Sequence, residues 1–348
     1  MNTVFEQAGP LRRRYAQLQE SKPKARIRAL AGEMGVSELE LVAAGCGQIR
    51  PTPLRGPVRD ILMQLGELGR VMALTRNEWC VHERRGRYED VRAGEAMGIV
   101  LGPDIDLRLF LAQWRHAWAV DDGGRLSLQF FDAAGGALHK VYVTDETDAA
   151  AYQALVRRFA DPEPRWPRLE APGDAPAAYH AGADPAQLRA DWLAMRDTHE
   201  FHGLLKRHKL ARLDALRLAG ADLAQQVPAD TAERMLGQVA GQDISFMCFV
   251  GNPGLIQIHT GPIHKLMRTG PWFNVLDPLF NLHLDTTAIA GAWVVNKPSD
   301  DGWITSLECY ANTGDLIVQF FGARKPGVPE LAEWRALLAG YCPEPLAA

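Results

Sequence analysis

The hydrophobic and polar positions along the chain change their period in a fixed order. Apolar residues recur at helical spacing over residues 11–45, where Ser37 followed by Glu40 is typical of a capping box at a helix start. Mixtures of Val, Leu, Met, Thr and Trp that are typical of strands follow over residues 69–83 and 90–101. The pattern therefore predicts helices first and strands afterwards.

Glycine-containing turns divide the next stretch of sequence into short apolar runs. Such spacing predicts an antiparallel meander. We expect, in order, a strand over 114–120, a turn at 121–124, a strand over 126–131, a turn at 134–136, a strand over 137–143 and a closing helix over 148–159.

The second half of the sequence repeats this order of elements. We expect helices over 186–226 and 230–238, strands between 243 and 321, and a last helix over 329–339. Helices that precede a run of antiparallel strands predict an α+β fold. Six prolines mark a linker. The predicted organisation is an N-terminal repeat over 1–160, a Pro-rich linker over 161–185 and a C-terminal repeat over 186–348.

Residue-by-residue matches show that the two halves descend from one duplicated unit. Asn77 and Asn252 lie 175 positions apart in similar surroundings, as do Trp118 and Trp293. Beyond them the offset becomes 179, so four residues are inserted between 296 and 303 of the second half. This insertion includes Lys297 and has no counterpart in the first half. One-sided polar additions to a duplicated scaffold suggest one ligand site, placed by the second half.

Composition narrows the class of protein. A hydrophobic content of 47% and a charged content of 23% are those of an ordinary globular chain of 348 residues. The net charge of −4 indicates no general attraction to nucleic acid or to anionic membranes. No apolar run reaches the roughly 18 residues of a membrane span, and the first residues do not resemble a signal peptide. Five scattered cysteines without a Cys-x-x-Cys pair favour reduced thiols in a cytoplasm.

Two histidines follow an apolar stripe in the second half. Leu188, Trp192, Met195, His199 and His202 share one face of a helix if that helix continues through Thr198. They would then present imidazole to a buried ligand, or serve as polar residues at a domain seam.

A different local structure is also compatible with this stretch. Asp197 and Glu200 have the spacing of a capping box, which would break the helix just before His199. A zinc site is the weaker interpretation, because neither Cys nor a nearby pair of carboxylates completes four ligands.

Basic and aromatic residues add candidates. Arg108 stands within an alternating apolar pattern, where it pairs either with Asp106 or Asp104 or with an anionic ligand. Phe249, with its strand neighbours Phe246 and Met247, fits a core position or a ligand wall. The remaining basic candidates are Arg212, Lys297 and Arg324.

Seven segments, in order, resemble one known family. The matching segments are Leu-Thr-Arg-Asn-Glu…Val-His-Glu (74–83), Ile-Asp-Leu-Arg-Leu-Phe (105–110), Asp-Thr-His-Glu-Phe (197–201), Ala-Leu-Arg-Leu-Ala-Gly (215–220), Ile-Gln-Ile-His-Thr-Gly-Pro (256–262), Gly-Pro-Trp-Phe-Asn-Val-Leu-Asp-Pro (270–278) and Gln-Phe-Phe-Gly-Ala-Arg-Lys (319–325). They resemble the cytoplasmic haem-utilisation proteins of Gram-negative bacteria, the HemS/HmuS/ChuS/PhuS type. The resemblance extends from about residue 25 to about residue 340.

The resemblance implies a duplicated α+β fold that holds one haem b per chain between its halves. His199 matches the axial iron ligand, and Arg108 matches an arginine that reaches over the other haem face, where it is the candidate catalytic residue. His202, present in only some relatives, is a possible alternative iron ligand. Phe321 stands where some relatives carry Tyr. The positions that match pocket and propionate-binding residues are Arg212, Phe249, Lys297, Gln319, Phe321 and Arg324.

The resemblance implies two functions that share this site. One is a cytoplasmic carrier that accepts imported haem and hands it on for iron acquisition, with a haem importer and a haem oxygenase as handover partners; His202 favours it. The other is a haem-degrading, haem oxygenase-like enzyme that takes electrons from a separate donor, because the sequence has no nicotinamide-binding fingerprint. The third interpretation is a sheet-based interaction module that binds no cofactor.

Overall fold

A computed structural model describes residues 3–171, 184–325 and 327–348, and these form two compact units. Unit 1 comprises residues 3–76, 83–171 and 251–257, and unit 2 comprises the other described residues. Three of the boundaries between units therefore fall within strands, namely β3 (Cys80–Gly86), β11 (Phe246–Asn252) and β12 (Leu255–Gly261). Much of the predicted Pro-rich linker, residues 172–183, lies outside the described residues.

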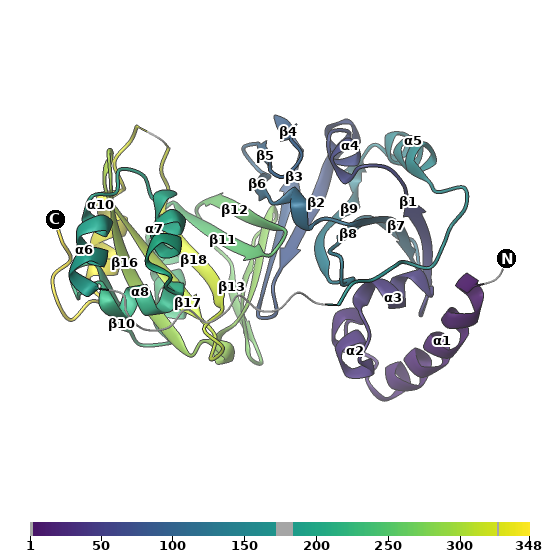
Figure 1. Cartoon of the computed structure of the whole chain (residues 1–348), viewed down its shortest axis with the longest axis horizontal. Coiled ribbons are helices and arrows are strands. Elements are labelled where there is room, and N and C mark those ends of the chain that lie inside the picture. Colours follow the sequence, from purple (N-terminus) through teal and green to yellow (C-terminus); the bar gives the residue numbers. More distant parts are fainter. Residues whose placement is uncertain (1–2, 172–183, 326) are drawn as a thin grey trace. The chain divides into compact units, whose positions relative to one another are not determined.

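The first half of the chain begins with helices and continues with strands (Figure 1). Its elements are α1 (Thr3–Ser21), α2 (Ile27–Met34), α3 (Glu38–Ala43), β1 (Ile49–Leu54), α4 (Val58–Leu62), η1 (Leu65–Leu68), β2 (Gly69–Arg76), β3, β4 (Val91–Ala93), β5 (Gly98–Leu101), β6 (Asp106–Leu109), η2 (Leu111–Gln113), β7 (His116–Asp122), β8 (Arg125–Phe131), β9 (Ala137–Thr147) and α5 (Ala149–Phe159).

The second half repeats this order (Figure 1). Its elements are α6 (Pro185–Leu193), α7 (Glu200–His208), α8 (Arg212–Leu218), β10 (Ala224–Val227), α9 (Thr231–Gln242), β11 (Phe246–Asn252), β12, β13 (Leu266–Thr269), β14 (Trp272–Leu276), β15 (Phe280–Asp285), η3 (Thr286–Ala288), β16 (Gly291–Ser299), β17 (Gly302–Tyr310), β18 (Leu316–Gly322) and α10 (Ala332–Ala339).

The predicted meander is present in both halves. Strands follow the order β1-β7-β8-β9-β2 in unit 1 and β10-β16-β17-β18-β11 in unit 2, and each of these neighbours pairs antiparallel. Gly123 and Gly124 connect β7 to β8 with φ values of 60° and 94°, which favour glycine in a tight hairpin. The predicted α+β duplication is therefore confirmed.

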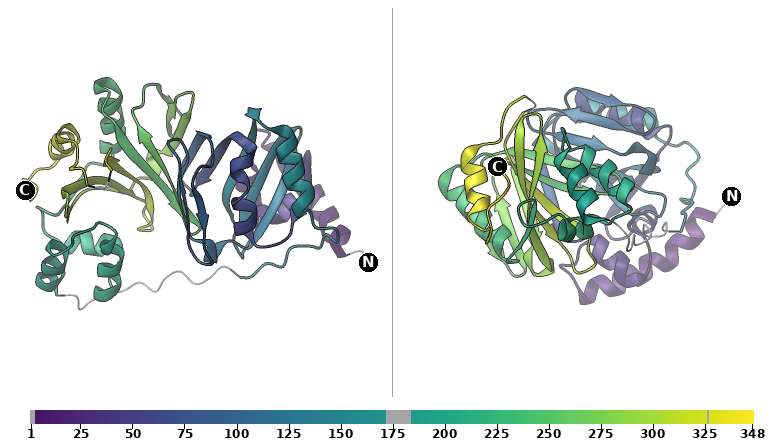
Figure 2. Two further views of the ribbon diagram at one scale, coloured as in Figure 1. Left: turned by 90° about the horizontal axis from the view of Figure 1, so that it is seen from above. Right: turned by 60° about the vertical axis from the view of Figure 1, so that its left-hand side comes forward.

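Helices cover both faces of the meander in each unit. In unit 2 the helices α6, α7 and α8 pack on one face through Leu188, Trp192, Phe201 and Leu204, while α9 and α10 cover the other face (Figure 2). In unit 1 the segment α3 packs on one face, and α4 and α5 pack on the other. Because the helices bury the apolar positions of alternate strand residues, each unit has its own core on either side of its sheet.

The four-residue insertion lengthens one hairpin. The strands β7 and β8 have seven residues each, whereas their counterparts β16 and β17 have nine each. Lys297 pairs in register with Ile304 on this added part of the hairpin, and Asp300 and Asp301 form its tip. The insertion therefore extends the sheet beyond the length that the first half has.

Local predictions were confirmed where the sequence carries a capping signal and were wrong at two edge strands. Ser37 caps α3, and its capping box with Glu40 is present. The strands β1 and β10 were not predicted, and residues 224–226 of β10 were assigned to a helix. Prolines at 51 and 53 are tolerated in β1 because it pairs on one side with β7 and lies at the end of the strand order.

Candidate functional site

His199 lies at the exposed N-terminus of α7, on the side of the unit 2 sheet that α6–α8 cover. Its side chain is 88% exposed, and its Nδ1 lies 2.6 Å from Oδ1 of Asp197. The same carboxylate oxygen accepts the backbone N–H of His199, which is the main reason that the pKa of Asp197 is lowered. A carboxylate at Nδ1 holds the proton there and leaves Nε2 with a free lone pair, as metal-binding histidines require.

The local structure decides between the two interpretations of this stretch. The helix α6 ends at Leu193 and α7 starts at Glu200, so the continuous helix was wrong. The helix does break before His199, but the capping box is not formed, because His199 itself is the N-cap and makes no side-chain cap. Glu200 instead accepts the backbone N–H of Arg196 at 3.3 Å. The exposed histidine thus stands at a helix start, with His202 exposed three residues later.

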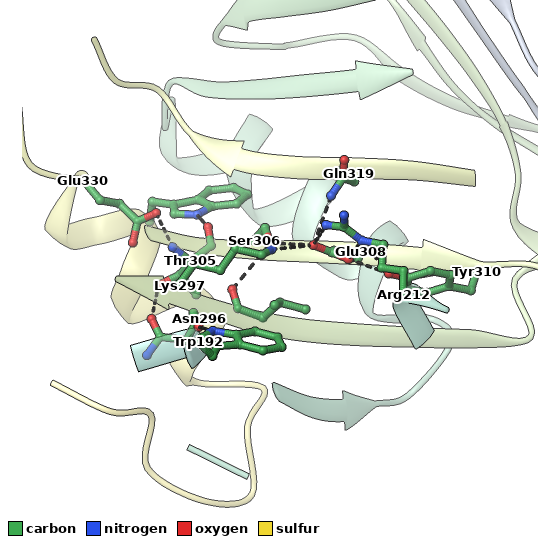
Figure 3. A network of polar contacts seen from close by, with 12 residues as sticks. Trp192, Arg212, Asn296, Lys297, Thr305, Ser306, Glu308, Tyr310, Gln319 and Glu330 are labelled. Atoms are coloured by element: carbon green, nitrogen blue, oxygen red, sulfur yellow. Dashed lines mark hydrogen bonds and ion pairs between the residues drawn. The ribbon is translucent and has the colours of Figure 1, made fainter. Parts of the chain in front are cut away.

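Three predicted pocket residues converge on a buried carboxylate (Figure 3). Glu308 of β17 has a fully buried side chain and accepts both Nε and Nη2 of Arg212, at 2.7 and 2.6 Å. Lys297 Nζ and Gln319 Nε2 each donate to Oε1 of the same carboxylate at 3.0 Å. The hydroxyls of Ser306 and Tyr310 complete the shell at 3.3 and 2.5 Å.

The two cations decide the charge state of this cluster. Burial alone would raise the pKa of the Glu308 carboxyl, but Arg212 and Lys297 hold it well below its usual range. Burial lowers the pKa of Lys297 to about 8, although Glu308 opposes this shift. With both cations protonated, the three side chains carry one net positive charge.

An aromatic ring connects the cluster to the histidine helix. Phe201 lies in the first turn of α7, two residues after His199, and is buried. The Arg212 guanidinium carbon is 4.9 Å from the centroid of this ring, and Lys297 Nζ is 4.7 Å from it. Both cations therefore pack on Phe201 at cation–π distances, which fixes the start of α7 relative to the buried charges.

The same sheet face continues into an apolar surface. Met247, Phe249 and Phe321 alternate with fully buried neighbours and are themselves partly exposed. The rings of Phe249 and Phe321 pack with centroids 4.9 Å apart, and Phe249 pairs in register with Gln319. By contrast, Phe246 is part of the core on the opposite face. The predicted wall residue Phe249 and the predicted polar residue Gln319 thus lie on one face of the unit 2 sheet.

The tip of the lengthened hairpin binds two loops of unit 2. Asp300 forms an ion pair with Arg196 at 2.9 Å, and its backbone N–H donates to the carbonyl of Arg196. Asp301 accepts Arg324 Nη2 at 2.7 Å and the backbone N–H of Gly327. Arg324 also contributes to the lowered pKa of Asp197, so it lies near the histidine loop.

Arg108 lies in β6 of unit 1, apart in sequence and unit from the other predicted residues. It forms an ion pair with Asp106 and a 3.3 Å hydrogen bond to the carbonyl of Leu107, and one third of its side chain is exposed. Burial raises the pKa of Asp106, and Arg108 opposes that shift. Of the two partners considered from sequence, Asp106 is therefore the one observed, whereas Asp104 pairs with Arg84.

The other features of the described residues indicate no second site. They contain no group of three His, Cys, Asp or Glu side chains arranged to hold a metal ion. Within that same part of the chain, no helix is long and apolar enough to cross a bilayer. A hollow of about 430 Å³ over β4 and β5 in unit 1 is lined by none of the predicted site residues. We therefore define the candidate site by its converging polar groups in unit 2.

Sequence reasoning missed three residues of this site: Asp197 as the partner of His199, Phe201 and Glu308. Glu308 had a visible signal, because it is an acid within the alternating strand segment Ile304–Tyr310. An arginine within a strand pattern predicts a partner, and an acid buried in a strand needs partners for the same reason.

The comparisons with known proteins give the chain its family. Residues 35–159 and 209–341 each match the Haemin-degrading HemS.ChuX domain, once in each half. The hemin transport protein HmuS of Yersinia pestis is 42% identical over 97% of this chain and 99% of its own length. Together, the repeated helix–meander fold and the two matches to one domain define a duplicated HemS-type protein. The chain belongs to the HemS/ChuX family.

Solved structures agree with this assignment. The holo form of PhuS, a haem-binding protein from Pseudomonas aeruginosa, is 44% identical and superimposes with a TM-score of 0.92 over 96% of this chain and 99% of that chain. The haem-degrading enzyme ChuS of Escherichia coli O157:H7 is 37% identical, with a TM-score of 0.90 over 97% of this chain and 100% of that chain. The relatives thus include proteins described by transport, binding and degradation.

Proposed function

We propose that this protein binds one haem b per chain and carries it between partners for iron acquisition, with His199 as the axial iron ligand. One observation carries the proposal: Asp197 binds Nδ1 of an 88% exposed imidazole and leaves Nε2 for iron. Haem binding by PhuS and hemin transport by HmuS support the same ligand.

Other side chains of unit 2 fit the rest of a haem. The partly exposed side chains of Met247, Phe249 and Phe321 supply apolar contact for a macrocycle. Arg212 and Arg324 carry guanidinium groups suited to propionate carboxylates, with Lys297 and Gln319 behind them. When bound, the iron of haem would supply the redox chemistry, and these side chains would orient the ring.

His202 supports the carrier function. It is exposed in the first turn of α7, three residues after His199, and it offers a second imidazole while the first releases iron. A carrier needs an iron ligand that exchanges, and two imidazoles in one helical turn suit a stepwise transfer of haem. The handover partners that we propose are a haem importer and a haem oxygenase.

The test uses the full chain, haem and three variants. Wild type is expected to show a Soret band that saturates at one equivalent, and His199→Ala is expected to lose affinity or change the axial ligand. Because His202 can rescue that variant, His199→Ala/His202→Ala is the cleaner comparison. If the double variant keeps the wild-type spectrum and affinity, the ligand assignment is wrong; saturation at two equivalents would refute the single site.

Transfer kinetics test the carrier function separately. His202→Ala is expected to bind haem nearly normally and to pass it to apomyoglobin more slowly than wild type. Equal transfer rates would remove the support that His202 gives to carriage.

Haem degradation is the second candidate function, because ChuS is described as a haem-degrading enzyme. Arg108 is the candidate catalytic residue for this function, because its guanidinium, which pairs with Asp106, would supply the positive charge and N–H donors that polarise dioxygen or peroxide. The haem-loaded protein is mixed with a reductant under air in the presence of catalase. Release of verdohaem or biliverdin supports an enzyme, whereas unchanged haem supports the carrier.

A further inference from the structure

The buried Glu308 fixes one cation in a defined orientation (Figure 3). Its two oxygens bind the Nε and Nη2 edge of Arg212, at 2.7 and 2.6 Å. A two-point contact sets both the position and the plane of a guanidinium, which a single hydrogen bond does not. The third nitrogen, Nη1, makes no hydrogen bond to any described residue, and 27% of the Arg212 side chain remains exposed.

Lys297 has a different role within the cluster. Only 3% of its side chain is exposed, and its ammonium group donates to Glu308 and packs on Phe201. A cation that is so enclosed compensates the buried carboxylate. Because Lys297 balances Glu308, the charge of Arg212 is not consumed by the contact that orients it.

We infer that Glu308 is a positioning residue for ligand carboxylates: with Lys297 as its counter-ion, it aims the free Nη1 edge of Arg212 at one propionate. This inference rests on the proposed haem-binding function. It assigns recognition to Arg212 and orientation to Glu308, and it makes the buried acid a determinant of preference for carboxylate-bearing porphyrins.

The sign of one substitution separates positioning from charge. Glu308→Gln removes one negative charge beside the ligand site, so electrostatics alone predicts tighter binding of the anionic haem. Positioning predicts the opposite, because the guanidinium loses its charged two-point partner. Glu308→Asp keeps the charge but withdraws the carboxylate by one methylene, so it weakens recognition only if geometry matters.

The experiment measures a preference ratio on the full-length protein. Affinities are determined for haem and for its dimethyl ester, which has the same macrocycle and iron but no free carboxylates. In Glu308→Gln and Glu308→Asp, we expect the preference for haem over the ester to fall about tenfold, the value of one charge-assisted hydrogen bond. The Soret maximum should stay unchanged, because His199 still binds the iron.

Two further variants control for general damage. Glu38→Gln removes the buried acid of the first half and should leave the preference ratio at the wild-type value. Arg212→Lys should lower the ratio by itself, and adding Glu308→Gln to it should lower it little further, since both act through one guanidinium.

The outcomes are distinct. Failure of wild type to bind haem would refute the proposed function. Normal binding with an unchanged or increased ratio in Glu308→Gln would overturn the positioning role and leave haem binding intact. Equal losses for haem and ester would likewise overturn it, because they would show a purely structural effect.

Discussion

Equivalent sheet positions in the two halves carry opposite arrangements of charge. Gln129 of β8 and Glu308 of β17 occupy the same place, each paired in register with a tryptophan on one side. Lys140 on the next strand of unit 1 forms a buried ion pair with Glu38 of α3. In unit 2 the acid is on the strand and its bidentate cation, Arg212, is on the helix.

The difference shows how a duplicated scaffold gained chemistry on one side. In the first half the pair Glu38–Lys140 balances itself between helix and sheet. In the second half the insertion adds Lys297, so two cations meet one acid and a positive charge remains. A neutral pair serves to hold a helix on a sheet, whereas a surplus cation can also meet an anionic ligand.

The largest effect on stability is expected when the charged cluster of the second half loses its acid. Glu308→Ala leaves the buried Lys297 and the partly buried Arg212 without their counter-ion and should lower the free energy of unfolding of unit 2 by about 3–5 kcal/mol. Gln129→Ala removes one neutral contact to Ser127 and should cost about 1 kcal/mol. Hydrogen exchange of slowly exchanging amides in β8 and β17 measures each unit separately. Equal losses in the two units would contradict the comparison.

Breaking the first-half pair should cost slightly less. Lys140→Met leaves the Glu38 carboxylate buried and unpaired, and we expect a loss of about 3 kcal/mol in urea unfolding of unit 1. Adding Glu38→Met should restore most of that loss, because two apolar side chains remove both buried charges. If the double variant is less stable than Lys140→Met, the pair is not a self-balancing contact.

The pH should affect the stability of unit 2 through another acid, the half-buried Glu330. Glu330 accepts the backbone N–H of Thr305 at 2.8 Å, and burial raises its pKa to about 7. A raised carboxyl pKa gives stability that is complete below the unfolded value of about 4.3 and is lost as the pH rises through 7.

Relative to Glu330→Gln, wild type should therefore lose about 2 kcal/mol of unit 2 stability between pH 5 and pH 8. The measurement is the denaturant concentration at which β17 is half unfolded, followed through hydrogen exchange of its amides at several pH values in this range. Parallel pH profiles for the two proteins would show that the group does not titrate as stated.

The smallest effect concerns the residue of the first half that corresponds to Arg212. By the 175-residue offset this residue is Ser37, which caps α3 by accepting the backbone N–H of Glu40. Ser37→Ala should cost about 1 kcal/mol in thermal unfolding of unit 1, the usual value of an N-cap. Ser37→Asp should retain most of the stability. No difference between alanine and serine would mean that the capping box contributes nothing here.

The parts of the fold that sequence predicted have local causes. The glycines at 123, 124 and 135 mark hairpin turns, and the Ser37–Glu40 capping box marks a helix start. The constant offset between halves then transfers each element to its copy. These signals act over a few residues, so a single sequence is enough to detect them.

The unpredicted parts depend on contacts distant in sequence. The break after Leu193 has neither glycine nor proline, and it is accompanied by contacts of Arg196 with Asp300. Glu308 gains its importance from Arg212, 96 positions away. The family resemblance supplied His199 as the predicted ligand, and the spacing of residues alone did not distinguish it from a surface histidine.

The assignment of residues 251–257 to unit 1 has a consequence for how the protein is made. Residues 251–257 belong to unit 1, where Leu255 lies in the core and the carbonyl of Gly254 accepts the indole N–H of Trp114 at 2.8 Å. Domains normally fold in order as they leave the ribosome. Here the first core stays incomplete until a late segment has been translated, so a nascent chain stalled before residue 251 should be digested by protease more readily than one released at full length.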